Sequence, residues 1–116
     1  MSANVAIVDF TIYRNVDWDI PFQFKDDAGD PVVFTGSTFE MEIATAAGAT
    51  ATLTLNTGNG GIASTDLANG KINVVLADEA IAVGDYVHDL VRIGGSGERE
   101  LLWRGAMAVV AGVSQP

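Results

Sequence analysis

Residues 84–110 read GDYVHDLVRIGGSGERELLWRGAMAVV, and this stretch decides the fold. Two apolar runs, from Tyr86 to Ile93 and from Leu101 to Val110, flank the sequence Gly94-Gly95-Ser96-Gly97. Apolar runs separated by a few residues that include glycine are typical of a β-hairpin. We therefore expect these two runs to pair as neighbouring antiparallel strands.

The same period of two continues toward the N-terminus. Apolar side chains alternate with polar ones in four further runs: Ile20, Phe22 and Phe24; Phe39, Met41 and Ile43; Leu53 and Leu55; and Ile72, Val74 and Leu76. One apolar and one polar face per run is typical of an antiparallel sheet that is buried on one side. Turn residues separate the runs at Asp26 to Pro31, at Gly58 to Gly61 and at Asn69-Gly70.

The N-terminal run from Val5 to Tyr13 is also strand-like, with Val8, Phe10 and Ile12 on its inward side. We expect it either to complete this chain's own sheet or to add to the exposed edge of a neighbouring protein.

The fold class that follows is all-β: an immunoglobulin-like antiparallel β-sandwich of about seven to nine short strands, with a small barrel as the alternative. Only residues 78–83 favour a helix, as one short turn that ends before Gly84. The chain has 116 residues, the size of one ordinary domain, so we predict a single β-sandwich domain over 1–116 with short N- and C-terminal arms.

Composition excludes several classes of function. The chain has no cysteine, which removes disulfides, thiolate metal sites and cysteine nucleophiles. Its 15 Asp and Glu against 6 Lys and Arg give a net charge of −9, so it lacks the basic stripe that nucleic-acid binding requires. Anionic membrane surfaces are disfavoured for the same reason. We expect partners that are neither nucleic acid nor membrane.

Met1 to Val5 lack the basic start and apolar core of a signal peptide, and no apolar run reaches the roughly 20 residues of a membrane span. We expect synthesis in the cytoplasm.

Few residues suggest catalysis or metal binding. His88 is the single histidine, and a histidine metal site needs companion ligands that this chain lacks. We interpret His88 as a half-buried packing residue. Glu40 and Glu42 share one side of a strand about 7 Å apart, a separation within the range of paired glycosidase carboxylates, but a solvated strand face explains them more simply. We predict no enzyme, no cofactor and no resident metal.

Asp26, Asp27 and Asp30 raise the question of calcium. Their spacing does not match the calcium-binding loop of an EF-hand, and turn chemistry explains them adequately. Together with an exposed Trp18 they are the basis of an alternative hypothesis, a carbohydrate- or calcium-binding β-sandwich.

Protein interfaces are enriched in Trp, Tyr and Arg. On this basis we predict contact roles for Trp103, Arg104, Tyr86 and Trp18. Core packing is the other role open to Trp103, because Leu101 to Arg104 belong to a strand that is apolar on both faces.

The order of these segments resembles a known group of proteins. Residues 27–36 (DAGDPVVFTG) precede Phe39 to Ile43; Gly70 to Val74 follow later, and residues 83–90 (VGDYVHDL) lead to a closing run from Arg104 to Val109. This layout is similar to small virion proteins of tailed bacteriophages and prophages, in particular to the immunoglobulin-like N-terminal domain of phage baseplate upper proteins. The resemblance covers roughly Asp9 to Val113 and supplies no catalytic residues.

The resemblance implies a non-enzymatic structural component of a tailed-phage virion: an adaptor or attachment module on the tail or baseplate. Its partners would be other virion proteins, in several symmetric copies, and its location the virion. Two alternatives stay open, a capsid decoration protein on the phage head and the carbohydrate- or calcium-binding module.

Overall fold

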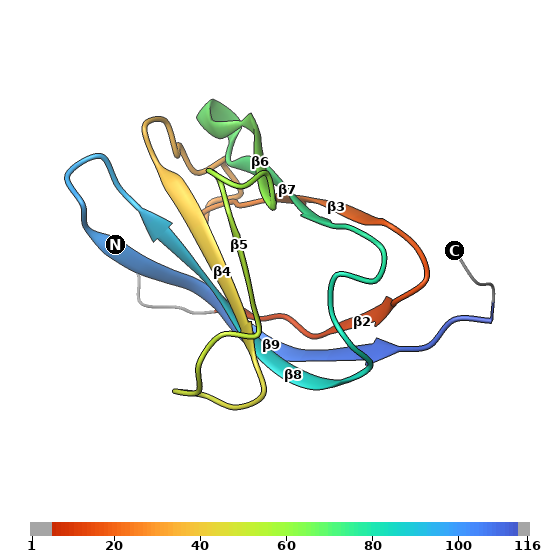
Figure 1. The fold of residues 1–116 in the computed structure, drawn as a ribbon. Helices are drawn as coiled ribbons and strands as arrows, with labels where there is room; N and C mark the ends of the chain where they lie inside the picture. Colours follow the sequence, from red (N-terminus) through yellow and green to blue (C-terminus); the bar gives the residue numbers. More distant parts are fainter. Residues whose placement is uncertain (1–5, 114–116) are drawn as a thin grey trace.

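The structure, a computed structural model, describes residues 6–113 as two β-sheets packed face to face (Figure 1). The strands are β1 (Ala6–Ile7), β2 (Phe10–Tyr13), β3 (Trp18–Gln23), β4 (Thr38–Ala44), β5 (Leu53–Asn56), β6 (Ile62–Asp66), β7 (Lys71–Leu76), β8 (Gly84–Ile93) and β9 (Arg99–Val110). The larger sheet has the order β1-β9-β8-β4-β5, with β2 following β1 along β9, and the smaller has the order β3-β7-β6. We call them sheet A and sheet B.

The predicted β-sandwich is therefore confirmed, and its strand order is immunoglobulin-like. In sheet A the central strand is β8, and with its neighbour β9 it forms the predicted hairpin, paired antiparallel from Gly84↔Val109 to Ile93↔Arg99. The pairings are antiparallel except at one edge, where β1 and β2 run parallel to β9. The N-terminal run thus completes the chain's own sheet, the first of the two arrangements expected for it.

One irregularity in the central hairpin explains why β9 is apolar on both faces. Leu90 pairs with Trp103, but the next residue, Val91, pairs with Leu101, so that Leu102 is an extra residue in a β-bulge. Because of the bulge, Leu102 and Trp103 are both buried although they are consecutive. Beyond it, Leu101 and Arg104 are exposed on the outer face.

The core between the sheets is built on aromatic side chains. Trp103 is 2% exposed and contacts rings from three other strands or loops, with Phe22 at 4.7 Å, Phe24 at 5.8 Å and Phe10 at 6.0 Å between ring centroids. The inward residues of the alternating runs, such as Met41 and Ile72, complete the core, as the period of two predicts. Aromatic side chains bury large areas in specific edge or stacked geometries, so this cluster fixes how the two sheets face each other.

Residues 78–83 do not form the predicted helical turn. The short helix lies instead at η1 (Leu67–Asn69), just before β7. Glu79 adopts a left-handed conformation with φ of 58°, and its N–H donates to the carbonyl of Arg14 at 2.8 Å. A left-handed residue interrupts a helix, and the bond to the carbonyl of Arg14, in the turn that follows β2, holds Glu79 in this conformation. This prediction was wrong because a contact distant in sequence determines the local conformation.

Tyr86 closes the same corner of the fold. Its hydroxyl donates to the carbonyl of Ala82 at 2.8 Å, across the connection between β7 and β8. This is the tyrosine corner of immunoglobulin-like sandwiches, in which a tyrosine near the start of the equivalent strand bonds back to the backbone a few residues upstream.

Two edges of the sandwich carry features that hinder pairing with another chain. The side chain of Asn59 covers the open edge of β5: its amide donates to Thr54 O at 2.9 Å and accepts from Asn56 N at 2.9 Å. Pro21 lies in β3, an edge strand of sheet B, where its missing N–H is tolerated. Edge strands are ordinarily liable to aggregate, and both features reduce that liability.

Among residues 6–113 there is no helix long and apolar enough to cross a lipid bilayer. The two predicted arms fall largely on residues 1–5 and 114–116, which lie outside the described residues.

Candidate functional site

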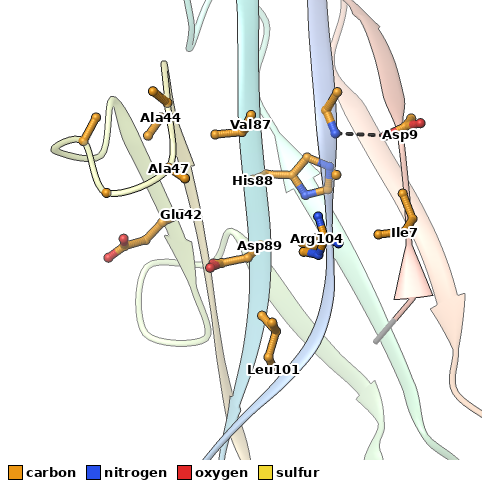
Figure 2. Close-up of a pocket in the computed structure, with 15 residues that line it drawn as sticks. Ile7, Asp9, Glu42, Ala44, Ala47, Val87, His88, Asp89, Leu101 and Arg104 are labelled. Atoms are coloured by element: carbon orange, nitrogen blue, oxygen red, sulfur yellow. Dashed lines mark hydrogen bonds between the residues drawn. The ribbon is translucent and has the colours of Figure 1, made fainter. Parts of the chain in front are cut away.

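The outer face of sheet A, which sheet B does not cover, carries a hollow of about 480 Å³ (Figure 2). Its floor comes from β8 and β9, and its sides come from β1 and from the loop Ala46–Ala49 that follows β4. We define the outer patch as six exposed or half-exposed side chains of this hollow: Ile7, Glu42, Val87, Asp89, Leu101 and Arg104. Asp9 also lines the hollow, where its carboxylate accepts a hydrogen bond from the Ala106 N–H.

Strand register brings most of the outer patch into one row. Ile7 pairs with Arg104, Arg104 with Asp89, and Asp89 with Glu42, so that four adjacent strands each contribute one side chain. Adjacent strands lie about 4.8 Å apart, and paired residues point to the same face. The row reads apolar, positive, negative, negative across the sheet.

Among the residues that the structure describes, the charges in this row have no ion-pair partners. Three of the arginines form ion pairs: Arg14 with Glu79, Arg92 with Glu100, and Arg99 with Glu40. Arg104 forms no ion pair or side-chain hydrogen bond with any described residue, although Asp89 is directly opposite it in the sheet. Asp89 and Glu42 likewise form no ion pair within residues 6–113.

The environment of Asp89 differs from that of a fully solvated surface carboxylate. Burial raises the pKa of Asp89, and the nearby charge of Glu40 acts in the same direction, whereas His88 and Arg99 lower it. The direction follows from desolvation, which disfavours the ionised form. A partly desolvated carboxylate that forms no ion pair gains from a cation that another molecule supplies.

The rest of the outer patch is apolar. Ile7 is 58% exposed, Leu101 40% and Val87 36%. The adjoining loop adds only small residues, Ala46, Ala47, Gly48 and Ala49. Single exposed apolar side chains are ordinary on protein surfaces, but three large ones gathered with an unpaired arginine resemble the centre of a protein interface.

His88 lies beneath the floor of this hollow and has a structural role. Its ring is 4% exposed and packs 4.9 Å from the ring of Phe10. Its Nε2 is 2.8 Å from the carbonyl oxygen of Val8, so the tautomer with the proton on Nε2 donates this bond. His88 is a packing residue, as the sequence indicated, although its side chain is buried rather than half-buried.

The bond from His88 explains the break between β1 and β2. Val8 N–H bonds Arg104 O at 2.9 Å, as a parallel ladder requires, but the Val8 carbonyl bonds His88 instead of Ala106 N–H. That N–H donates to Asp9 Oδ1 at 2.9 Å. Gly105 lies opposite His88, where a Cβ would collide with the Val8 carbonyl. Two side chains therefore replace one ladder bond at the edge of sheet A.

Burial lowers the pKa of His88, while its hydrogen bond to the Val8 carbonyl and the charges of Asp89 and Asp9 act to raise it. Desolvation is the largest of these causes, so the imidazole stays neutral at neutral pH.

Two of the predicted interface residues are buried. Trp103 packs in the core, and Tyr86 is 9% exposed with its hydroxyl bonded to Ala82. Both therefore contribute to the fold, and neither offers its ring to a partner; Trp103 has the core-packing role that the sequence left open. Arg104 is exposed at the centre of the outer patch. Trp18 is half-buried, with its ring 4.9 Å from that of Phe10.

The aspartates near residue 26 form a turn. Asp26 Oδ1 accepts from Ala28 N and Asp30 N, both at 3.0 Å, which is the turn chemistry expected from the sequence. Residues 6–113 contain no group of three or more His, Asp or Glu side chains suited to hold a metal ion. The exposed Trp18 of the carbohydrate hypothesis is in fact partly covered.

Sequence reasoning identified Arg104 but missed Ile7, Val87, Asp89 and Leu101. The signal that was available is the outward half of each alternating run, where Val87 and Asp89 stand between buried residues. Their grouping depends on the β8–β9 register and on the parallel pairing of β1, neither of which the alternation reveals.

No known protein family and no curated protein matches this chain.

Proposed function

We propose that this protein is a non-enzymatic structural module of a tailed-phage virion, an adaptor or attachment component of the tail or baseplate that binds protein through the outer patch. The single observation that carries the binding role is the outer patch itself. Three exposed apolar side chains lie there beside Arg104 and Asp89, which form no ion pair with any described residue. The virion setting rests on the resemblance of the segment order.

The chemistry of the patch supports protein binding over catalysis. A catalytic site needs a nucleophile or base within reach of an orienting group. The one histidine of the chain is buried and bonded to a backbone carbonyl, and the patch holds neither serine nor cysteine. Exposed apolar side chains gathered beside an arginine are instead typical of an interface between proteins.

The acidic character of the chain fits this role. A net charge of −9 keeps a protein soluble and discourages adsorption to the nucleic acid that a phage particle contains. Specific docking then depends on a small surface where apolar area outweighs charge, as it does at Ile7, Val87 and Leu101.

The proposal is tested by incorporation of the protein into particles from its source. Val87→Asp places a charge in the outer patch, and Val33→Asp makes the same change at an exposed residue outside it. Both variants should fold, since both sites are exposed. We expect Val87→Asp to reduce the amount of protein per particle by about tenfold or more, as the loss of a central apolar contact implies, and Val33→Asp to leave it unchanged.

Antibody labelling of the same particles in the electron microscope locates the protein. Label at the tail tip supports the adaptor assignment, whereas label spread over the head identifies a capsid decoration protein. Equal incorporation of both variants would contradict the role of the patch, and particles without label would contradict the virion role altogether.

A further inference from the structure

We infer that the protein seated on the outer patch is a second copy of this chain, packed face to face about a two-fold axis that runs parallel to the strands between β8 and β9. The inference rests on the proposed function, because it names the partner of the same patch. It follows from the pattern of charge and apolar bulk on the outer face of β8 and β9.

The outer face of β8 and β9 is self-complementary under this symmetry. Three of its cross-strand pairs lie at the patch: Val87 with Ala106, Asp89 with Arg104, and Val91 with Leu101. The axis turns β8 of one copy onto β9 of the other and preserves the position along the strand. Asp89 then faces Arg104 of the second copy, and Arg104 faces its Asp89, so two ion pairs form at once. Apolar side chains face each other on both sides of the ion pairs.

The other axis that lies in the plane of the sheet does not fit. A two-fold axis at right angles to the strands places Arg104 opposite Arg104 and Asp89 opposite Asp89. Like charges held together in an interface are costly, so charge selects the axis parallel to the strands. An isologous contact of this kind closes after two copies.

The sides of the hollow also suit a second copy. The same axis places β4 of one copy above β1 of the other, so that Ile7 meets the region of Glu42 and the loop Ala46–Ala49. Ile7 is 58% exposed in the single chain and loses water contact there. The alanines and glycine of the loop permit a close approach because they carry little side-chain bulk.

A basic segment of another protein fits less well. Glu42 and Asp89 attract such a segment, but Arg104 lies beside them in the same row, on the strand next to that of Asp89 and about 4.8 Å away. A purely cationic partner therefore leaves Arg104 facing a like charge. The second copy offers a cation to Asp89 and an anion to Arg104 at the same time.

The contact area indicates a weak dimer. Four strands about 4.8 Å apart and about five residues along each, at about 3.4 Å per residue, give a face of roughly 300 Å². Stable interfaces bury about 800 Å² per partner, so we expect a dissociation constant in the range of about 10 μM to 1 mM. Multiple attachment points on a symmetric particle would strengthen such a contact through high local concentration.

The test exchanges the two charges between separate chains. Arg104→Glu places a new carboxylate against Asp89 of the second copy, and Asp89→Arg places a new guanidinium against its Arg104. An equimolar mixture of the two variants restores opposite charges across the contact in a heterodimer. Sedimentation velocity up to about 1 mM should show dimerisation of the wild type, a dissociation constant at least about tenfold weaker for each variant alone, and recovery to within about threefold of the wild type on mixing.

Matched controls carry the same kinds of charge change elsewhere on the surface. Lys71→Glu on sheet B and Asp27→Arg in the β3–β4 connection alter exposed residues outside the patch and should leave dimerisation unchanged. Circular dichroism and the thermal midpoint establish that each variant is folded.

Three results would overturn the inference: a wild type that stays monomeric at the highest concentration, variants that dimerise as the wild type does, or a mixture that shows no recovery. Each is separable from failure of the proposed function, which is measured by incorporation into particles. Loss of incorporation in Val87→Asp together with a monomeric wild type would mean that the patch binds a different protein.

Discussion

Acidification should destabilise this protein through His88, and a single substitution should remove the effect. The imidazole is buried against Phe10 and donates from Nε2 to the Val8 carbonyl. Burial lowers its pKa below the ordinary value of 6.5. In His88→Gln, an amide N–H remains available for Val8, but the side chain no longer titrates.

The direction of the pH effect on the free energy of unfolding follows from proton uptake on unfolding. Between the lowered pKa of the folded state and about 6.5, the unfolded chain binds a proton that the folded chain does not, so the free energy of unfolding falls as pH falls. The stabilisation is complete above about pH 6.5 and decreases below it. Its slope reaches at most about 1.4 kcal/mol per pH unit, the value for one proton.

Asp89 contributes in the opposite direction. Its pKa is raised in the folded state, so between the ordinary value of 3.8 and that raised pKa the folded chain binds the extra proton, and stability rises as pH falls. Comparison of the wild type with His88→Gln largely cancels this contribution, because both proteins retain Asp89.

The assay is urea denaturation followed by tryptophan fluorescence at several pH values between about 7.5 and 5.5, a range that spans the ordinary histidine pKa. The fluorescence of Trp103 reports on unfolding around His88, since the centroids of the two rings are 6.5 Å apart. We expect the free energy of unfolding of the wild type to fall relative to that of the variant as pH decreases. Parallel curves for the two proteins would refute the account of His88 as a neutral, desolvated core residue.

Three further substitutions test other parts of the structure. Trp103→Ala should lower the free energy of unfolding by about 3–5 kcal/mol, as expected for a large buried side chain, and chemical denaturation measures this; a loss under about 1 kcal/mol would contradict the core-packing role of Trp103. Tyr86→Phe removes the bond to Ala82 and should cost about 0.5–1.5 kcal/mol without changing the circular dichroism spectrum, and an unchanged thermal midpoint would show that the tyrosine corner contributes nothing. Asn59→Ala uncovers the edge of β5 and should increase aggregation, as followed by light scattering on mild heating, whereas Asn69→Ala in the turn before β7 should not; equal behaviour would count against edge protection.

Much of the fold follows from the sequence because side-chain alternation is a local property. Each strand needs one face toward the core, and the alternation in the runs around Phe22, Met41 and Val74 indicates which residues lie on that face. The hairpin of β8 and β9 was equally accessible, since its two arms and its turn are contiguous.

The predictions that failed concern features that depend on contacts distant in sequence. Residues 78–83 have helix-like ends, but Glu79, bonded through its N–H to the Arg14 carbonyl, adopts a left-handed conformation that excludes a helical turn. Trp103 and Tyr86 belong to residue types that favour interfaces, but whether a side chain faces in or out depends on register, and for Trp103 on the bulge at Leu102. Composition alone does not contain that information.

The outer patch was predictable only in part, for the same reason. Arg104 was identified by residue type, whereas its neighbours Ile7 and Asp89 are separated from it in sequence by 97 and 15 positions and meet it only through strand pairing. A candidate surface on a sheet emerges when outward residues are placed in register, which requires the structure.

The most direct test of the central claim, that the outer patch is the surface by which this protein is assembled, is thiol accessibility within the particle. The chain has no cysteine, so Val87→Cys and Ser64→Cys each introduce a single reactive group, the first in the outer patch and the second on an exposed position of sheet B. Maleimide labelling is measured for the free protein and for the assembled particle. We predict that assembly protects position 87 and leaves position 64 reactive; equal labelling of position 87 in the free and assembled protein would contradict the account.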